Sequence, residues 1–70
     1  MIYLEDYIEK GIRKGLDVSW FVREEWDMEQ LYDIARGLED GLDVSIYAKK
    51  EFDFGLMEEI RYGLLKEKKG

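Results

Sequence analysis

The sequence predicts an all-α fold of tandem long-helix and short-helix pairs, stacked as a small right-handed solenoid of about five helices. Three observations predict it. Gly-Leu-Asp-Val-Ser occurs twice, at Gly15–Ser19 and Gly41–Ser45, a separation of 26 residues. The same spacing relates Ile8, Ile34 and Ile60, and also Gly11, Gly37 and Gly63. Apolar residues between the two copies follow helical spacing, and a fixed period of this size is typical of stacked repeats.

The period divides one small domain, residues 1–70, into units of roughly residues 1–26, 27–52 and 53–70. Hydrophobic residues make up 46% of the chain and charged residues 40%, a balance that favours a folded helical protein over a disordered one. The chain has no cysteine and no histidine. Disulfides and the usual zinc ligand sets are therefore excluded as sources of stability.

The first unit should contain a long helix over residues 2–14, which Gly15 ends by taking a left-handed conformation. Asp17 then fits the cap of a short helix, because its carboxylate can accept the free N–H groups of the next turn. This short helix, residues 18–24, should bury Val18, Phe21 and Val22.

The second unit repeats this logic and is the best specified. Asp27 and Gln30 form a capping box that starts a long helix at Met28, and this helix runs to about Asp40 before Gly41. Asp43 then caps a second short helix, with Val44, Tyr47 and Ala48 facing inward.

The third unit begins at the cap Asp53, and its helix starts at Phe54. Ile60, Leu64 and Leu65 complete its apolar face, and residues 66–70 should fray or form a short disordered end. Glycine inside a long helix costs about 1 kcal/mol relative to alanine. Its recurrence at positions 11, 37 and 63 predicts close approach of the neighbouring short helix, or alternatively an early helix end.

A family resemblance rests on the pattern of Trp26–Ala48: aromatic-Asp, a Gln three residues after the Asp, Ile-x-x-Gly-Leu and Gly-Leu-Asp-Val-Ser-x-Tyr-Ala. This pattern resembles a short helical repeat of uncharacterised proteins of Firmicutes and their mobile elements, and more loosely the leucine-rich-variant repeats. The resemblance covers residues 8–65 and implies stacked helix pairs, with no catalytic residue to carry over. Leu56 in place of Gln, and Glu9 and Ala35 in the column of Arg61, depart from it.

Little in the sequence indicates catalysis, so we expect no enzyme, no cofactor and no metal. Nucleophilic Ser-His-Asp or Cys-His sets are impossible without His or Cys. The remaining candidates are the acidic pairs 24–25, 39–40 and 58–59, which we expect to be solvated on helix faces and ends rather than held in a pocket. The acidic stretch around Gly41 fails as an EF-hand loop, because Arg36 and Leu38 fall at ligand positions.

The net charge of −6 resides in the first 48 residues, which carry −7, whereas the remainder carries +1. An acidic body repels phosphate, so we expect no nucleic-acid partner. Apolar runs fall short of a membrane span, and the N-terminus lacks the features of a signal peptide. We therefore expect no membrane partner and a cytoplasmic location.

Four aromatic residues stand where other copies of the repeat carry charge or need no inward side chain: Tyr7, Trp20, Tyr32 and Tyr62. Exposed aromatics are typical of binding surfaces, although they could instead cover the ends of the repeat stack. We predict a non-enzymatic protein–protein interaction module with an unidentified protein partner or a second copy as a homodimer. The alternative is an acidic inhibitor that mimics nucleic acid, whose binding would weaken steeply with salt.

Overall fold

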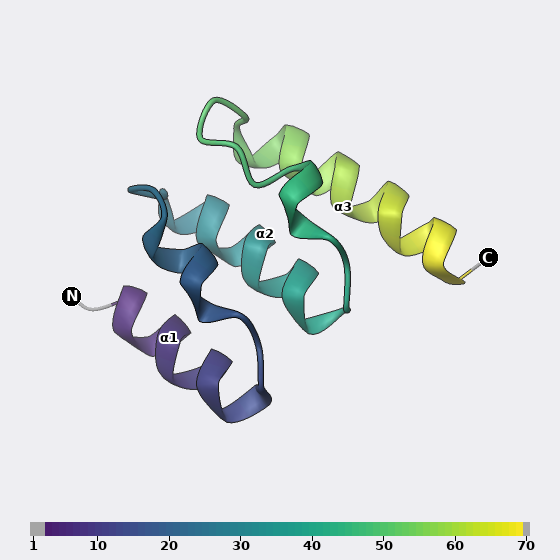
Figure 1. The fold of residues 1–70 in the computed structure, drawn as a ribbon. Helices are drawn as coiled ribbons and strands as arrows, with labels where there is room; N and C mark the ends of the chain where they lie inside the picture. The colour runs from purple at the N-terminus through teal and green to yellow at the C-terminus, as the bar shows by residue number, and fades with distance from the viewer. Residues whose placement is uncertain (1–2, 70) are drawn as a thin grey trace.

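The computed structural model describes residues 3–69, which form three α-helices and two short 3-10 helices (Figure 1). The α-helices are α1 at Tyr3–Lys14, α2 at Met28–Glu39 and α3 at Phe54–Lys69. The 3-10 helices are η1 at Val18–Val22 and η2 at Val44–Ile46. Within the described residues no strand occurs, which confirms the predicted all-α class.

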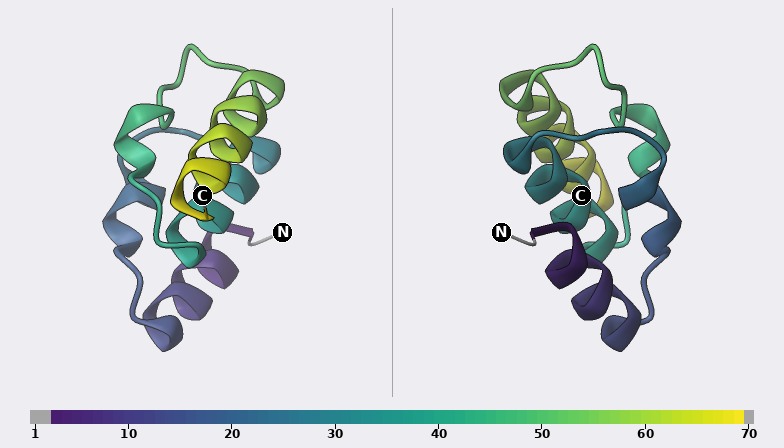
Figure 2. Two further views of the ribbon diagram at one scale, coloured as in Figure 1. Left: turned by 90° about the vertical axis from the view of Figure 1, so that its right-hand side faces the viewer. Right: turned by 90° about the vertical axis from the view of Figure 1, so that its left-hand side faces the viewer.

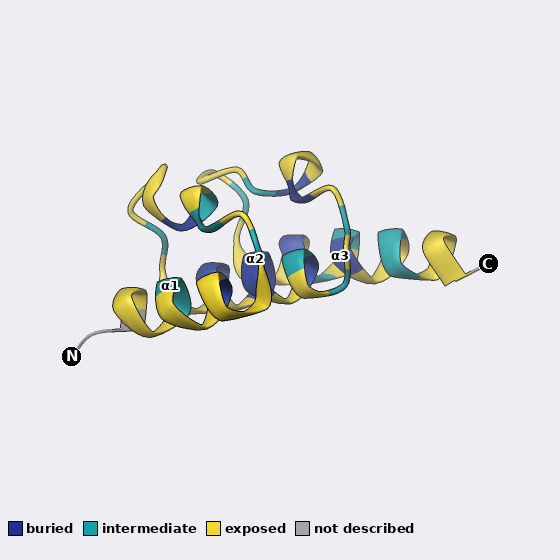
Figure 3. Ribbon diagram, turned by 60° about the horizontal axis from the view of Figure 1, so that its bottom comes forward, coloured by how far each residue is buried: buried dark blue, intermediate teal, exposed yellow. Residues whose placement is uncertain are grey.

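The three α-helices lie side by side in one layer, with α2 in contact with both α1 and α3. The 3-10 helices and their loops form a second layer on one side of these helices (Figures 2 and 3). The other side of the helix layer is largely exposed (Figure 3). Each long helix before a Gly-Leu-Asp turn is thus covered from one side only.

The predicted solenoid of about five helices is not supported, because residues 3–69 contain three α-helices and the short segments are 3-10 turns. Segments this short make too few hydrogen bonds to offset the cost of starting an α-helix. The 3-10 geometry also corrects the expected burial of Val22, which is 60% exposed. Residues three apart eclipse one another in a 3-10 helix, so Val18 and Phe21 face inward together and Val22 faces out.

All four aspartates predicted to start helices do so. Oδ1 of Asp17 accepts from the Ser19 N–H and Oδ1 of Asp43 from the Ser45 N–H, both at 3.1 Å. Before α3, the Asp53 carboxylate accepts from the backbone N–H of Leu56 at 2.8 Å. These bonds satisfy donors that a helix start would otherwise leave free. The capping box at Asp27 is also present.

The predicted left-handed glycines are confirmed, with φ of +74° at Gly15 and +73° at Gly41. Each belongs to a turn in which a following leucine N–H reaches back to an earlier glycine carbonyl: Leu16 to Gly11 at 2.8 Å, and Leu42 to Gly37 at 2.9 Å. This is the pattern of a Schellman motif.

The predicted fraying after residue 65 is wrong for residues 66–69, which belong to α3; residue 70 lies outside the described residues. At the position of Gly15 and Gly41 the third unit has Glu67, so nothing there favours a left-handed turn. Lys66, Lys68 and Lys69 in the last turn also suit the negative end of the helix dipole.

The core lies between the two layers and combines residues from both. Its buried apolar side chains are Phe21, Leu31, Ile34, Ala35, Val44, Tyr47 and Met57. Tyr47 and Ile34 are fully buried, and Phe21 from η1 is 1% exposed. The core therefore depends on one aromatic side chain from each 3-10 segment.

Two of the three recurring glycines are contact points for these segments, which confirms the packing reason for them. A Cβ on Gly11 would lie 2.5 Å from Val18 Cγ1, and a Cβ on Gly37 would lie 2.8 Å from Val44 Cγ1 and against the Tyr47 hydroxyl. A Cβ on Gly63 would have no atom within 4 Å. The described residues provide no third 3-10 helix to pack on α3.

Replacing Gly37 with alanine should lower the free energy of unfolding by about 1–3 kcal/mol, because Tyr47 and Val44 must move to admit the methyl group. Gly63→Ala is the matched control in the same repeat position. It should raise the free energy of unfolding by up to about 1 kcal/mol through helix propensity alone. Urea unfolding followed by circular dichroism measures both, and a shift of the same sign for the two variants would contradict the contact.

Candidate interaction surface

The exposed side of the helix layer carries the largest accessible apolar side chains of α2 and α3. Met28 lies about two and a half turns before Gly37, which places it on the side of α2 opposite the 3-10 layer. Phe54 has the same relation to Gly63 on α3. Met28 is 48% exposed, Tyr32 47% and Phe54 50%.

These side chains border a shallow depression that crosses the helix layer, which we call the aromatic groove and define by Tyr7, Met28, Tyr32 and Phe54. Glu29, Asp33 and Glu58 also line it. Tyr7 and Tyr32 line a second hollow between α1 and α2 as well, together with Lys10, Arg36 and Glu39. The two tyrosines thus line both hollows.

The predicted surface residues divide between the two layers. Tyr7 and Tyr32 come together at the aromatic groove. Tyr62 is 56% exposed on α3, with the Arg61 guanidinium 4.9 Å from its ring centroid. Trp20 lies in η1, in the other layer, so the four do not form one surface.

Trp20 is half-buried against the core. The Arg23 guanidinium lies 3.8 Å from its ring centroid, and Trp26 Nε1 donates to its backbone carbonyl at 2.9 Å. Tyr7 is also half-buried, with its ring centroid 5.8 Å from that of Phe21. Both side chains therefore pack against the apolar core and are only partly accessible.

Sequence reasoning missed Met28 and Phe54. Both directly follow an aspartate cap, and the capping pattern accounts for the helix start without assigning a face to the next residue. The sequence does contain a signal for them. If Gly37 and Gly63 mark the inner side of each helix, Met28 and Phe54, half-way round the helix, are predicted to lie on the exposed side.

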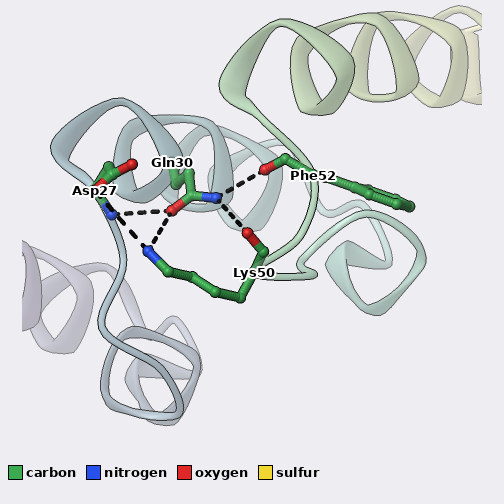
Figure 4. Close-up of polar contacts among 4 residues, drawn as sticks. All are labelled: Asp27, Gln30, Lys50 and Phe52. Atoms are coloured by element: carbon green, nitrogen blue, oxygen red, sulfur yellow. Dashed lines mark hydrogen bonds and ion pairs between the residues drawn. The ribbon is translucent and has the colours of Figure 1, made fainter.

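Gln30 fixes how the start of α2 sits against the loop that leads to α3 (Figure 4). Its Oε1 accepts from the Asp27 N–H at 3.0 Å and from Lys50 Nζ at 3.2 Å. Its Nε2 donates to the carbonyls of Lys50 at 3.2 Å and Phe52 at 2.8 Å. Gln30 is 4% exposed, so these bonds replace water and hold Met28 near Phe54.

A buried ion pair holds α3 against α2 beneath the groove. Arg61 Nε lies 2.9 Å from Asp33 Oδ1, and the two side chains are 4% and 3% exposed. The Tyr47 hydroxyl donates to the Asp33 carbonyl at 2.6 Å, which links the pair to η2. Burial raises the pKa of the Asp33 carboxyl, and the hydrogen bond from Arg61 partly offsets that rise.

Tyr32 is oriented by its own helix. Arg36 Nη1 donates to the Tyr32 hydroxyl at 3.2 Å, one turn along α2. Burial raises the pKa of the Tyr7 phenol, and nearby Tyr32 and Glu39 raise it further. The Tyr7 phenol is therefore neutral at ordinary pH and available as a hydrogen-bond donor.

The acidic pairs considered for catalysis do not come together. Glu24, Glu25, Glu39 and Glu59 are exposed, whereas Asp40 and Glu58 are partly buried. Over residues 3–69, no group of three or more acidic side chains is placed to hold a metal ion. In the same range, no helix has both the length and the apolar character to cross a membrane.

Comparison of this chain with protein-family models, with curated proteins and with solved structures finds no match. The resemblance to a helical repeat of Firmicutes therefore stays a prediction.

Removing Arg61 alone should be severely destabilising, by about 3–5 kcal/mol, because it leaves the Asp33 carboxylate buried without its partner. We expect Arg61→Met to be largely unfolded, since a domain this small has a net stability of only about 3–5 kcal/mol. The double variant Asp33→Leu/Arg61→Met should refold, because the uncompensated charge is gone. A double variant less stable than Arg61→Met in urea unfolding would contradict this account.

Tyr47→Phe should lower the free energy of unfolding by about 1 kcal/mol at neutral pH, through loss of the bond to the Asp33 carbonyl. Burial raises the pKa of the Tyr47 phenol above its ordinary value of 10.0, so the unfolded chain loses this proton first. The stability that Tyr47 contributes is then complete below pH 10 and falls as pH rises further. The gap between wild type and Tyr47→Phe should close within about one pH unit above that value; a constant gap would contradict it.

Proposed function

We propose that this chain is a non-enzymatic protein–protein interaction module, whose contact surface is the aromatic groove with Tyr62 beside it. The observation that carries the proposal is the group of large side chains, about half exposed, that line one groove across the helix layer: Met28, Tyr32 and Phe54. Tyr62 on α3 is exposed as well. Aromatic residues and methionine are enriched in protein interfaces, and tyrosine supplies most of its contact area at low entropic cost.

Rigid support for this surface favours the proposal. Gln30 ties the start of α2 to the loop before α3, and the buried Asp33–Arg61 pair joins the two helices underneath. A preformed face loses less conformational entropy on binding than a mobile one. A second copy is one candidate partner, since two such faces could bury their apolar side chains against each other.

The charges around the groove favour this function over an acidic mimic of nucleic acid. The charged residues that line the groove, Glu29, Asp33 and Glu58, are acidic, whereas Lys10 and Arg36 line the adjoining hollow that Tyr32 also lines. A mimic would be expected to present one sign of charge over a broad face, with strong dependence of binding on salt. Mixed charge around apolar side chains instead suits a protein partner with a polar rim.

The double variant Tyr32→Glu/Phe54→Glu should lose the proteins that immobilised wild type captures from a lysate of the source organism. The matched control is Val22→Glu/Ile46→Glu, which adds the same charge in the other layer, where Val22 is 60% exposed and Ile46 45%. We expect the control to retain those proteins, and raised salt to leave most of them bound. Equal loss from both variants, or release from wild type at moderate salt, would contradict the aromatic groove as the contact surface.

A further inference from the structure

Successive long helices meet in one repeated register. Lys14 Nζ on α1 lies 2.8 Å from Glu39 Oε2 on α2, at a separation of 25 residues. Arg61 on α3 lies 2.9 Å from Asp33 on α2, at a separation of 28 residues. Both separations bracket the repeat period of 26 residues between Gly15 and Gly41. A residue therefore faces positions slightly before and slightly after its own equivalent in the next unit.

Other residue pairs at the two helix–helix contacts have the same separations of 25 and 28 residues. Tyr7 and Tyr32 are 25 residues apart, and both line the hollow between α1 and α2. Asp33 and Glu58 are also 25 residues apart, and they line the aromatic groove together. Tyr7 and Ala35 are 28 residues apart, and both line the hollow between α1 and α2. The two contacts between long helices within residues 3–69 thus share one register, and we extend this register past α3 to ask how a second copy would stack.

In this register, a second copy stacked on α3 would place its α1 where a fourth long helix would lie. Glu59 would then face Asp6 and Glu9 of the second copy, which are acidic like itself. Lys66 would face Arg13 of the second copy, which is basic like itself. All of these side chains are exposed in the single chain, and Glu9 and Arg13 pair with each other at 3.1 Å.

The same positions carry favourable pairs inside the chain. Lys66 corresponds to Lys14, which pairs with Glu39, and Glu59 corresponds to Asp33, which pairs with Arg61. The junction would otherwise attract, because Leu65 would face Ile12 of the second copy, a side chain that is 64% exposed. Charge is therefore the feature that distinguishes the outer faces of α1 and α3 from the contacts between long helices within residues 3–69.

We propose that like charges on the outer faces of α1 and α3 block head-to-tail stacking of one copy on the next. An end-to-end contact of this kind does not close on itself, so without a block it would build an open filament. Sheet proteins use charge at exposed edges for the same purpose, and repeat proteins carry polar outer faces on their terminal repeats.

The test exchanges two residues within α1. Glu9 and Arg13 form an ion pair at 3.1 Å, one turn apart on the outer face. The double variant Glu9→Arg/Arg13→Glu keeps this pair, the composition and the net charge of −6. It places a basic side chain at position 9 of one copy opposite Glu59 of another, and an acidic side chain at position 13 opposite Lys66.

We expect wild type to show no head-to-tail association at low salt, and the exchanged variant to form chains whose mass grows with concentration. Exposed pairs are individually weak, so we expect head-to-tail association to strengthen roughly tenfold in total. Sedimentation measures this in the Tyr32→Glu/Phe54→Glu background, which removes association through the aromatic groove. Circular dichroism confirms that the variant is folded.

Two controls test the register itself. Adding Lys66→Glu to the exchanged variant puts an acidic side chain opposite the acidic side chain now at position 13, and should reverse the association. Wild type added to the exchanged variant should shorten its chains, because its α3 face binds the exchanged α1 face whereas its own α1 face ends the chain. A folded exchanged variant with the sedimentation of wild type overturns the proposal, as do open-ended oligomers of wild type or chains that wild type fails to shorten.

Discussion

The fold depends first on the seating of a 3-10 helix against a glycine of the preceding long helix. At Gly37 the Tyr47 hydroxyl occupies the space where any other residue would place its Cβ. The Gly37 carbonyl also accepts from the Leu42 N–H at 2.9 Å, so the same residue shapes the turn that leads to η2. Gly37 therefore determines both where the chain leaves α2 and where η2 packs against that helix.

This seating allows a very short segment to complete the core. A 3-10 turn buries little surface, but Phe21 and Tyr47 each place a whole aromatic ring between the layers. Tyr47 then binds the carbonyl of Asp33, whose carboxylate pairs with Arg61 on α3. Asp33 thus links the contact between the two layers to the contact between α2 and α3. This network lies beneath the aromatic groove and supports it.

The helix ends could be predicted from the sequence, because the residues that determine them lie close together in the chain. The aspartate caps and the left-handed Gly15 and Gly41 follow from the needs of helix ends, which one unit of sequence contains in full. The 3-10 conformation of residues 18–22 did not follow, because apolar spacing within five residues fits a 3-10 and an α-helical turn equally well. A segment this short makes too few hydrogen bonds to offset the cost of starting an α-helix, so the 3-10 turn forms instead.

The buried pair escaped prediction for a related reason. Asp33 shares its repeat column with Tyr7 and Glu59, and Arg61 shares its column with Glu9 and Ala35, so neither column suggests burial. Tyr32 and Tyr62 could be assigned to the exposed face because aromatics replaced charges there. The repeat period does not determine the register between neighbouring helices to within a few residues. Only the structure shows that Asp33 contacts Arg61.

That register also gives each helix a specific neighbour. At the contact between α1 and α2 a large residue, Tyr7, faces a small one, Ala35, whereas the equivalent places between α2 and α3 hold Asp33 and Arg61. If α2 and α3 exchanged places, Glu59, at the repeat position of Asp33, would bury its carboxylate against Ala35. The Arg61 guanidinium would lie against Tyr7, and neither charge would have a counter-charge. Residues that repeat therefore build the shape of each unit, and residues that differ determine the order in which the units pack.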